Sequence, residues 1–169
     1  MHTSPSIQLL PQLTSDQIAE LSDMLQDVVA DGASIGFLSP LSREEAEHYW
    51  RNAVDSGVFL WAAYVNGRIA GTIQLQLAMK KNATHRAEIA KLMVHPSARR
   101  LGIARALMHA AHEQAKREKR SLLILDTRAG DPSNDLYKSL GYAEAGRIPG
   151  FARSSDGGFD ATVIYYLNI

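Results

Sequence analysis

Hydrophobic and polar positions change their period once between residues 88 and 116. Up to Val94 they alternate, which places one set of residues on the same face of a strand: Glu88, Ala90, Leu92 and Val94. After Arg100, apolar residues recur every three or four positions, like the inner stripe of a helix: Leu101, Ala104, Leu107, Met108, Ala111 and Ala115. The pattern therefore predicts a strand that a short segment, 95–100, joins to a helix.

Two helices are predicted in the first third of the chain. Thr14 and Gln17 resemble a capping box, and apolar residues at helical spacing follow to about Ala30. Ser42 and Glu45 form a second such pattern before a shorter helix. The segment between these helices, 32–40, is apolar, punctuated by glycine and too irregular for either period. A loop in this place can line a pocket.

Strand patterns occupy much of the remaining chain. Residues 58–65 and 68–79 are separated by Asn66-Gly67, a type I′ hairpin signal, and so form an antiparallel pair. Residues 121–127 form a short apolar run typical of a buried parallel strand, which makes the central region a βαβ unit.

The C-terminal part of the sequence predicts one more helix and the end of the sheet. A short helix is expected over 133–140, with Gly141 as its C-cap. Strands at 142–147 and 159–167 then close the sheet, and the glycine-rich stretch 148–159 between them reads as a long loop. The fold class is therefore α/β.

The segment between the central strand and its helix has the features of a phosphate cradle. Pro96 stops the strand, Arg99 and Arg100 follow, and Gly102 stands at the helix entrance with Arg105 just inside it. Unpaired backbone N–H groups and the positive end of the helix dipole attract anions there. Three arginines within seven residues strengthen that attraction.

The spacing selects among the known kinds of phosphate loop. The sequence contains neither a P-loop nor the Rossmann glycine fingerprint. R-R-L-G-I-A, at 99–104, resembles the Q/R-x-x-G-x-G/A pyrophosphate loop of the GNAT superfamily of acyl-CoA-dependent N-acetyltransferases. D-L-Y-K-S-L-G-Y, at 135–142, resembles the superfamily's second signature. Beyond these signatures, the stretches 32–37, 86–99, 125–130 and 148–151 resemble its tabtoxin-resistance branch.

The resemblance implies a three-layer fold and a binding site for acetyl-CoA as co-substrate. The fold would be a mixed sheet of about six to seven strands flanked by about four helices. The implied cofactor-binding residues are Met93, Val94, Arg99, Arg100, Leu101, Gly102, Ile103, Ala104, Arg105 and Asn134. Members of the family often carry asparagine seven residues before the signature tyrosine, where this chain has Gly130, so Asn134 is a displaced replacement.

The resemblance also implies catalytic roles for three residues. Tyr137 takes the place of the tyrosine that protonates the departing CoA thiolate, and a pKa of about 10 keeps tyrosine protonated at neutral pH. Glu88 takes the place of a general base, and Asp126 ends the next parallel strand as a second carboxylate. Structural alternatives exist for each: a packed core tyrosine, an ion pair of Glu88 with Lys91 or an arginine, and helix capping or loop bonding by Asp126.

Composition limits the chemistry further. The 169 residues suit one N-acetyltransferase domain, 1–169. Cysteine is absent, which excludes disulfides, thiolate zinc sites and a cysteine nucleophile, so the acceptor is expected to attack the thioester directly. The six histidines show no metal spacing, and no metal is expected. No apolar run approaches the roughly 20 residues that cross a bilayer, and no signal peptide is visible, so a cytoplasmic protein is expected.

Charge is uneven along a chain whose formal net charge is zero. Residues 1–60 hold nine acidic and two basic residues, a net charge of −7, which leaves +7 downstream. This division suits a polyanionic cofactor and a cationic acceptor amine, although the solvated faces of two helices explain it as well. We expect acetyl transfer to the primary amine of a small molecule, such as an amino-acid-like toxin or antibiotic. The alternatives are a protein or peptide N-acetyltransferase and a silent acyl-CoA sensor. We expect no nucleic-acid or membrane partner, and a monomer or homodimer.

Overall fold

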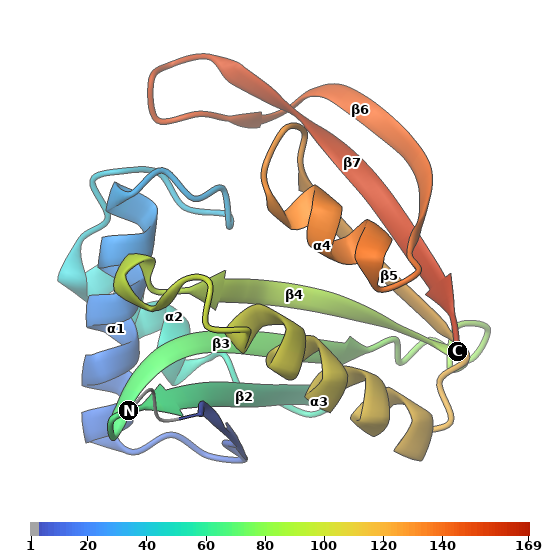
Figure 1. Ribbon diagram of the computed structural model, residues 1–169, viewed down its shortest axis with the longest axis horizontal. Coiled ribbons are helices and arrows are strands. Elements are labelled where there is room, and N and C mark those ends of the chain that lie inside the picture. Colours follow the sequence, from blue (N-terminus) through green and yellow to red (C-terminus); the bar gives the residue numbers. More distant parts are fainter. Residues whose placement is uncertain (1–3) are drawn as a thin grey trace.

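A mixed sheet with the strand order β1-β2-β3-β4-β5-β7-β6 organises residues 4–169, the part of the chain that the computed structural model describes (Figure 1). The strands are β1 (Ser6–Leu9), β2 (Val58–Val65), β3 (Arg68–Leu77), β4 (Arg86–Val94), β5 (Leu122–Arg128), β6 (Ala143–Arg153) and β7 (Phe159–Asn168). The helices are α1 (Ser15–Ala30), α2 (Arg43–Arg51), α3 (Ile103–Arg117) and α4 (Ser133–Ser139), with a single 3₁₀ turn, η1 (Pro96–Ala98). Seven strands and four α-helices in this part of the chain confirm the predicted fold class.

The helices cover both faces of the sheet and give the fold three layers. Trp50 of α2 and Leu60 of β2 belong to an apolar cluster under α1 and α2. Leu107 of α3 and Tyr137 of α4 belong to a second cluster, together with Trp61 of β2. Because Leu60 and Trp61 are successive residues that point to opposite faces of β2, the two clusters lie on opposite sides of the sheet.

β4 and β5 form the only parallel pair in the described sheet, and they part early. They pair over Arg86–Glu88 and Leu122–Ile124. Beyond these residues β4 continues to pair with β3, while β5 continues to pair with β7. The two strands therefore diverge toward their carboxyl ends and leave main-chain groups of β4 unpaired on that side.

A β-bulge interrupts β4 at Lys91. The register against β3 shifts between Thr72 and Gln74, and Lys91 has a φ of +52°. The hydroxyl of Thr72 donates a hydrogen bond of 3.0 Å to the Lys91 carbonyl and so supports this conformation. The bulge breaks the simple alternation that the sequence predicts up to Val94.

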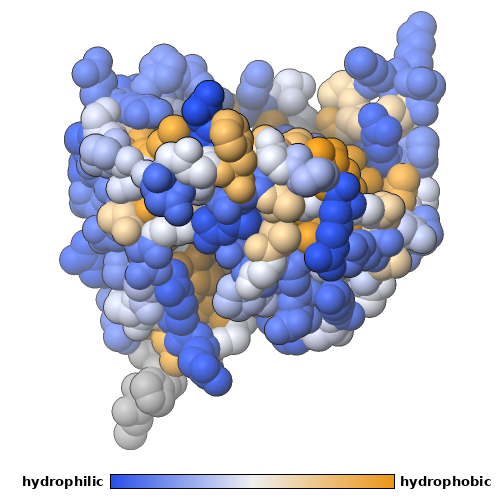
Figure 2. Space-filling model, turned by 90° about the horizontal axis from the view of Figure 1, so that it is seen from above, coloured by the Kyte–Doolittle hydropathy of each residue, from blue (hydrophilic) through white to orange (hydrophobic). Residues whose placement is uncertain are grey.

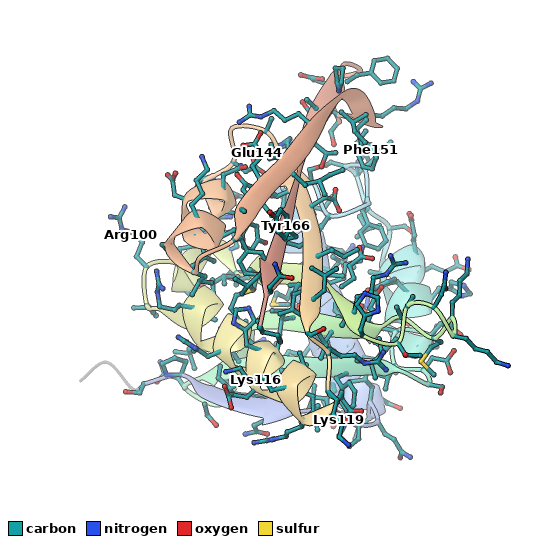
Figure 3. All side chains as sticks on the ribbon, turned by 90° about the vertical axis from the view of Figure 1, so that its right-hand side faces the viewer. Arg100, Lys116, Lys119, Glu144, Phe151 and Tyr166 are labelled. Atoms are coloured by element: carbon teal, nitrogen blue, oxygen red, sulfur yellow. The ribbon has the colours of Figure 1, made fainter. Side chains whose placement is uncertain are left out.

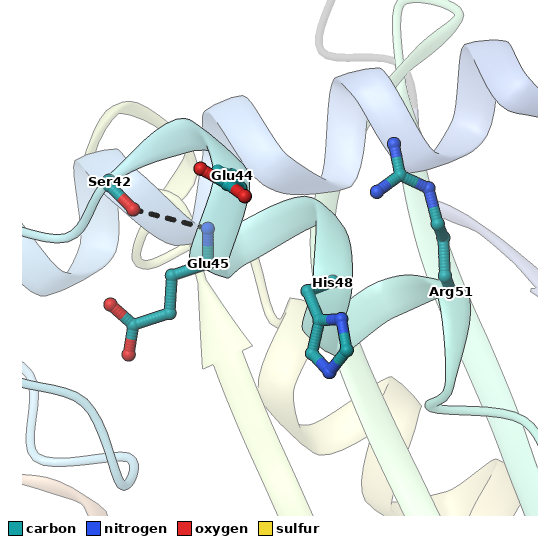
Figure 4. A pocket seen from close by; sticks show the side chains of 5 residues that line it. All are labelled: Ser42, Glu44, Glu45, His48 and Arg51. Atoms are coloured by element: carbon teal, nitrogen blue, oxygen red, sulfur yellow. Dashed lines mark hydrogen bonds between the residues drawn. The ribbon is translucent and has the colours of Figure 1, made fainter.

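Local capping signals are largely realised. The Thr14 side chain accepts from the Gln17 N–H, and the Gln17 side chain accepts in return from the Thr14 N–H, which completes a capping box at α1. At α2 the Ser42 hydroxyl accepts from the Glu45 N–H at 3.1 Å (Figure 4). Asn66 and Gly67 both have positive φ, as a type I′ turn requires.

Two expectations from the sequence are wrong in detail, and one strand was missed. β6 extends to Arg153, so most of the expected loop 148–159 is a long edge strand followed by a short turn. β1 pairs with β2 at the other edge and was not predicted. α3 begins at Ile103, so Leu101 precedes the helix and is 38% exposed. None of the helices within 4–169 is both long and apolar enough to span a membrane.

Candidate active site

A cavity of about 870 Å³ opens where β4 and β5 diverge. Its walls come from the α1–α2 loop, β4, the start of α3, the end of β5, α4 and the β6–β7 hairpin. From above, hydrophilic side chains surround exposed apolar ones, and the surface is hollowed between them (Figure 2). The cavity joins the predicted cofactor and catalytic residues, because Glu88, Met93, Arg99 to Arg100, Gly102 to Arg105, Asp126 and Tyr137 all line it.

The start of α3 supplies an anion-binding end of the cavity. Gly102 is the N-cap residue, with a φ of +76° and no side chain to cap the helix. The helical hydrogen bonds begin only with Ala106 N–H to Gly102 C=O at 3.1 Å. The preceding N–H groups are therefore available to an anion, as expected for a phosphate cradle.

The three arginines of the cradle differ in their partners. Arg99 forms an ion pair of 2.5 Å with Asp31 at the end of α1. Arg105 donates to the Ser139 hydroxyl at 2.8 Å and so links α3 to α4. Arg100 forms no ion pair within residues 4–169, and its side chain extends away from the protein (Figure 3). A phosphate can therefore engage Arg100 without displacing any described partner, whereas it would compete with the Ser139 hydroxyl for Arg105 and with the Asp31 carboxylate for Arg99.

The end of β4 forms the next part of the cavity wall, with Met93 and Val94 both lining it. Gly71 of β3 allows the close packing behind this wall, because a Cβ there would lie 2.9 Å from the Met93 carbonyl oxygen. It would also lie 3.0 Å from Ile103 Cγ2. The glycine therefore lets β3, β4 and the first turn of α3 approach one another.

Two of the expected cofactor-binding residues are outside the cavity wall. Leu101 is exposed and does not line the cavity. Asn134 also lies outside the lining: its amide group donates to the carbonyls of Arg128 at 2.9 Å and Asp131 at 2.8 Å. Its carbonyl oxygen accepts from the Tyr165 hydroxyl at 2.9 Å. The Asn134 side chain thus holds the β5–α4 loop against β7. This structural role was not predicted from the sequence.

Tyr137 lines the cavity from α4 while its ring packs in the core. The residue is 5% exposed, and its ring lies beside those of Tyr142 and Tyr165. Its hydroxyl donates no hydrogen bond to another described residue. Burial, then the negative charges of Asp126 and Asp131, raise the pKa of Tyr137 above its ordinary value, so the phenol holds its proton at neutral pH. The Tyr137 ring therefore packs in the core, as expected from the structural alternative. Its hydroxyl is still free to donate a proton to a bound ligand.

Glu88 faces the cavity rather than the core. Ala87 and Ile89 point to the buried face of β4, whereas the Glu88 side chain is exposed on the other face. No ion pair with Lys91 or an arginine forms within 4 Å in the described structure, so the structural alternative for Glu88 is not realised. Partial loss of water inside the cavity, then the charge of Asp126, raise the pKa of Glu88, while Lys91 and Arg86 oppose this.

Asp126 is the second carboxylate of the cavity. It lies on β5 beyond the last residue that pairs with β4, and one of its carboxylate oxygens accepts from the Thr162 hydroxyl at 2.8 Å. This bond fixes the carboxylate against β7 and leaves its other oxygen without a hydrogen bond from residues 4–169. The expected pair of carboxylates in one cleft is therefore present.

The end of the cavity beside Glu88 and Asp126 also contains residues that the sequence analysis did not assign to a site. Lys91 enters it from the bulge of β4, and Arg128 from the end of β5. Arg128 is bound by Asp131 at 3.0 Å, by Asp160 at 3.6 Å and by the Gly32 carbonyl at 2.9 Å. From the sequence, Lys91 is expected only as an ion-pair partner of Glu88, because a bulge without a local sequence signal is needed to turn its side chain into the cavity.

Two loops meet over this end of the cavity. The Ser39 N–H in the α1–α2 loop donates to the Ser155 hydroxyl in the β6–β7 turn at 3.0 Å. Phe151 on β6 also lines the cavity and is 54% exposed (Figure 3). The expectation that the loop 32–40 lines a pocket is confirmed.

A second, smaller hollow in the surface is less suited to chemistry. It lies along α2 and has a volume of about 330 Å³, with Ser42, Glu44, Glu45, His48 and Arg51 around it (Figure 4). All five side chains come from one turn-and-helix segment, and the Ser42 hydroxyl caps the helix there. Among residues 4–169, no group of three histidine or carboxylate side chains is placed to hold a metal ion.

Comparisons with known proteins agree with this geometry. The sequence profile of the Acetyltransferase (GNAT) family matches residues 24–142. A protein of Azospirillum brasilense, described as an uncharacterized N-acetyltransferase in the hisH-hisA intergenic region, is 31% identical over 129 residues, which are 75% of this chain and 77% of that protein.

Solved structures have the same fold. An N-acetyltransferase from Staphylococcus aureus Mu50 superposes with a TM-score of 0.82 at 16% identity, covering 98% of this chain and 99% of that one. A Salmonella typhimurium protein solved with its cofactor acetyl-CoA gives a TM-score of 0.80 at 15% identity, covering 98% of this chain and 94% of that one. With the match to the family profile, the divergent β4 and β5 and the cradle at α3, these results establish that the chain belongs to the GNAT acetyltransferase family and is an N-acetyltransferase.

Proposed function

We propose that the protein, as a single domain over 1–169, transfers the acetyl group of acetyl-CoA directly to the primary amine of a small molecule. The observation that carries this proposal is the continuous cavity that joins the α3 cradle to Glu88, Asp126 and Tyr137. A polyanionic cofactor fits the arginine-rich end, and a cationic amine fits the end with two carboxylates. An amino-acid-like toxin or antibiotic, as in the tabtoxin-resistance branch, is an acceptor of this kind.

The cradle residues support binding of the pyrophosphate of acetyl-CoA. The N–H groups at the start of α3 and the Arg100 guanidinium would hold it, while the unpaired backbone of Met93 and Val94 faces the gap between β4 and β5. The bound thioester supplies an activated acetyl group. Side chains of the cavity would bind the acceptor and transfer the protons.

Glu88 is the proposed general base. An amine that attacks a thioester must first lose its proton, and a carboxylate with a raised pKa accepts protons better at neutral pH than an ordinary glutamate does. Asp126 would hold the cationic acceptor by charge. Tyr137, which keeps its proton at neutral pH, would donate it to the departing thiolate.

The contact between the two loops supports a small acceptor over a protein chain. With Ser39 hydrogen-bonded to Ser155, the α1–α2 loop and the β6–β7 hairpin bridge the acceptor end. An extended peptide would need this bridge to open. A protein or peptide acceptor, such as a terminal amine, therefore remains the second candidate.

An acceptor screen read by mass spectrometry tests the proposal. The protein is incubated with acetyl-CoA and with two matched panels, small primary amines and short peptides with free N-termini, while free thiol is measured. We expect acetylated small amines with equal thiol release. Acetylation of peptides alone would overturn the small-molecule acceptor. Binding of acetyl-CoA without thiol release in either panel would identify a silent sensor.

A further inference from the structure

We propose that Lys91 selects the acceptor by binding an anionic group, of the carboxylate class, on the same molecule as the amine that is acetylated. The inference rests on the proposed function, because it concerns the acceptor of that reaction. It adds a recognition residue and a chemical requirement, so that the preferred acceptor carries both an ammonium and a carboxylate.

The backbone of β4 is arranged to bring Lys91 into the cavity. Lys91 has a φ of +52°, a conformation that non-glycine residues rarely adopt, and it lies at the bulge against β3. Bulges near active sites redirect side chains, and such strain persists where the surroundings enforce it. Here the Thr72 hydroxyl enforces it through its bond to the Lys91 carbonyl.

A fitted enclosure holds the ammonium group. Lys91 Nζ donates to the Ile35 carbonyl at 2.8 Å and lies 5.5 Å from the centre of the Phe37 ring and 5.6 Å from that of Tyr49. Gly36 leaves the room for it, because a Cβ at that position would lie 3.2 Å from Nζ. The α1–α2 loop and α2 therefore place this cation in one location.

The second aromatic ring of the enclosure is itself fixed. The Tyr49 hydroxyl accepts from the buried Gln74 side chain at 2.8 Å, and burial raises the pKa of Tyr49 to about 12. Tyr49 also packs edge-on against Phe37, with ring centres 5.2 Å apart. Tyr49 thus stays neutral at physiological pH. It contacts the Lys91 ammonium through its ring and does not neutralise the positive charge.

The Lys91 cation has unused hydrogen-bonding capacity. An ammonium group has three donors, and only one is used by a described residue, the Ile35 carbonyl. No carboxylate lies within 4 Å of it in the described structure, although the charges of Asp126 and Glu88 reach it. Burial lowers the pKa of Lys91, because the half-buried cation has lost water. An anion in the cavity would replace that water.

Arg128, the second cation at this end of the cavity, is less available to a bound carboxylate. Arg128 is already paired with Asp131 and Asp160. Glu88 and Asp126 supply negative charge for an ammonium, and Lys91 supplies positive charge for a carboxylate. An acceptor with both groups matches both features, whereas a plain amine leaves the Lys91 donors unused.

Kinetics with matched acceptors test the inference. The acceptors are leucine with 3-methylbutylamine, methionine with 3-(methylsulfanyl)propylamine, and 4-aminobutyrate with propylamine, each pair differing by the carboxylate. The variant is Lys91→Met, which keeps an apolar chain over the two rings. The control is Lys81→Met, which removes an exposed lysine of the β3–β4 loop.

In wild type, kcat/KM should favour the member with the carboxylate in at least one pair. Lys91→Met should reduce that preference roughly 10- to 100-fold, the value of a hydrogen bond to a charged group, mainly through KM of the acid. The amine of each pair, measured in the same variant, corrects for the effect of the lost Lys91 charge on the Glu88 carboxyl. The Lys81→Met control should change neither the rate nor the preference. An unchanged preference in Lys91→Met, or an equal loss for acid and amine, overturns the inference while leaving acetyl transfer to amines intact.

Failure of the proposed function gives a different result. If no amine is acetylated in either series, the function itself is wrong, and calorimetric titration of the CoA-loaded protein with leucine decides the role of Lys91. Equal leucine affinity in wild type and Lys91→Met then overturns the inference. Lys91→Gln, which can still donate to the Ile35 carbonyl, serves as the second variant if Lys91→Met does not fold.

Discussion

Asp126 and Glu88 lie on the same side of the sheet, on the two strands that diverge. Glu88 pairs with Ile124, and Asp126 follows Ile124 by two residues on β5. The negative charge of Asp126 adds to burial in raising the pKa of the Glu88 carboxyl. The divergence of two parallel strands thus creates both the cavity and the electrostatic environment of the proposed base, Glu88.

Two isosteric substitutions separate the roles of these carboxylates. Glu88→Gln should lower kcat about 10²- to 10⁴-fold and remove the acidic limb of the pH–rate profile, because an amide cannot accept the proton. Asp126→Asn should mainly raise KM for the acceptor, because it removes a charge that attracts the ammonium. Steady-state kinetics from pH 5 to 9 measure both. The opposite pattern, with the acidic limb lost only in Asp126→Asn, would reverse the roles.

The raised pKa of Glu88 also predicts a dependence of stability on pH. The native state binds this proton more tightly than the unfolded state, so ionisation of Glu88 lowers native stability above its folded pKa. Below the unfolded pKa of about 4.3 that cost is absent. Glu88→Gln should therefore raise Tm relative to wild type at pH 7 to 8, and the gain should shrink toward pH 4. A Tm difference that is the same at both pH values would show that Glu88 has no raised pKa.

Tyr137→Phe should separate catalysis from folding. The ring remains packed against Tyr142 and Tyr165, and the hydroxyl that is lost has no hydrogen-bond partner among residues 4–169. Tm and acetyl-CoA affinity should stay near wild type, while kcat falls about 10²- to 10⁴-fold. A wild-type single-turnover rate in this variant would leave Tyr137 as a core residue only.

Arg100→Glu tests the phosphate cradle. The arginine has no ion pair within the described structure, so reversing its charge should leave folding intact and weaken acetyl-CoA binding. Calorimetric titration at low and high salt measures this, with Lys81→Glu as a charge-matched control in the exposed loop that precedes β4, whereas Arg100 follows the end of that strand. The loss should be greater at low salt, where screening is weaker. Affinity equal to that of the control would exclude Arg100 from the site.

The fold and the cradle could be predicted because each depends on residues that are close together in the sequence. Glycine and arginines at the start of α3 act through the helix terminus itself, and the signature around Tyr137 lies within one short helix. Lys91 was missed because its direction depends on a bulge whose register is set by β3. The hydrogen bonds of Asn134 were not predicted, because one partner, Tyr165, is distant in the sequence and the others are backbone carbonyls.

The long strand β6 could not be read from its sequence for a related reason. Ile148 to Arg153 contains two turn-forming residues, a proline and a glycine, and β6 is exposed along most of its length. Proline and glycine are tolerated there because the strand lies at an edge, with pairing on one side only, to β7. Edge position is a property of the whole sheet and leaves no hydrophobic alternation in the strand itself.

Gly71→Ala tests whether close packing behind β4 positions the cradle. Alanine is ordinarily better than glycine in a strand, since glycine loses more backbone entropy on folding. At this position, however, the new methyl group would lie 2.9 Å from the Met93 carbonyl oxygen and 3.0 Å from Ile103 Cγ2. The first of these is backbone and cannot turn away, so β4 or α3 must move. Overpacking of this kind costs about 1–3 kcal/mol.

The matched control is Gly146→Ala in β6, where an added Cβ would meet no atom within 4 Å. Thermal unfolding should show a lower Tm for Gly71→Ala, by about 2–4 °C for each kcal/mol lost, and an unchanged or slightly higher Tm for Gly146→Ala. Because Met93 and Ile103 line the cavity, Gly71→Ala should also weaken acetyl-CoA binding in calorimetry at a temperature where both variants are folded. Reduced Tm with wild-type affinity would mean that the displacement is absorbed inside the core and that the cradle does not depend on this contact.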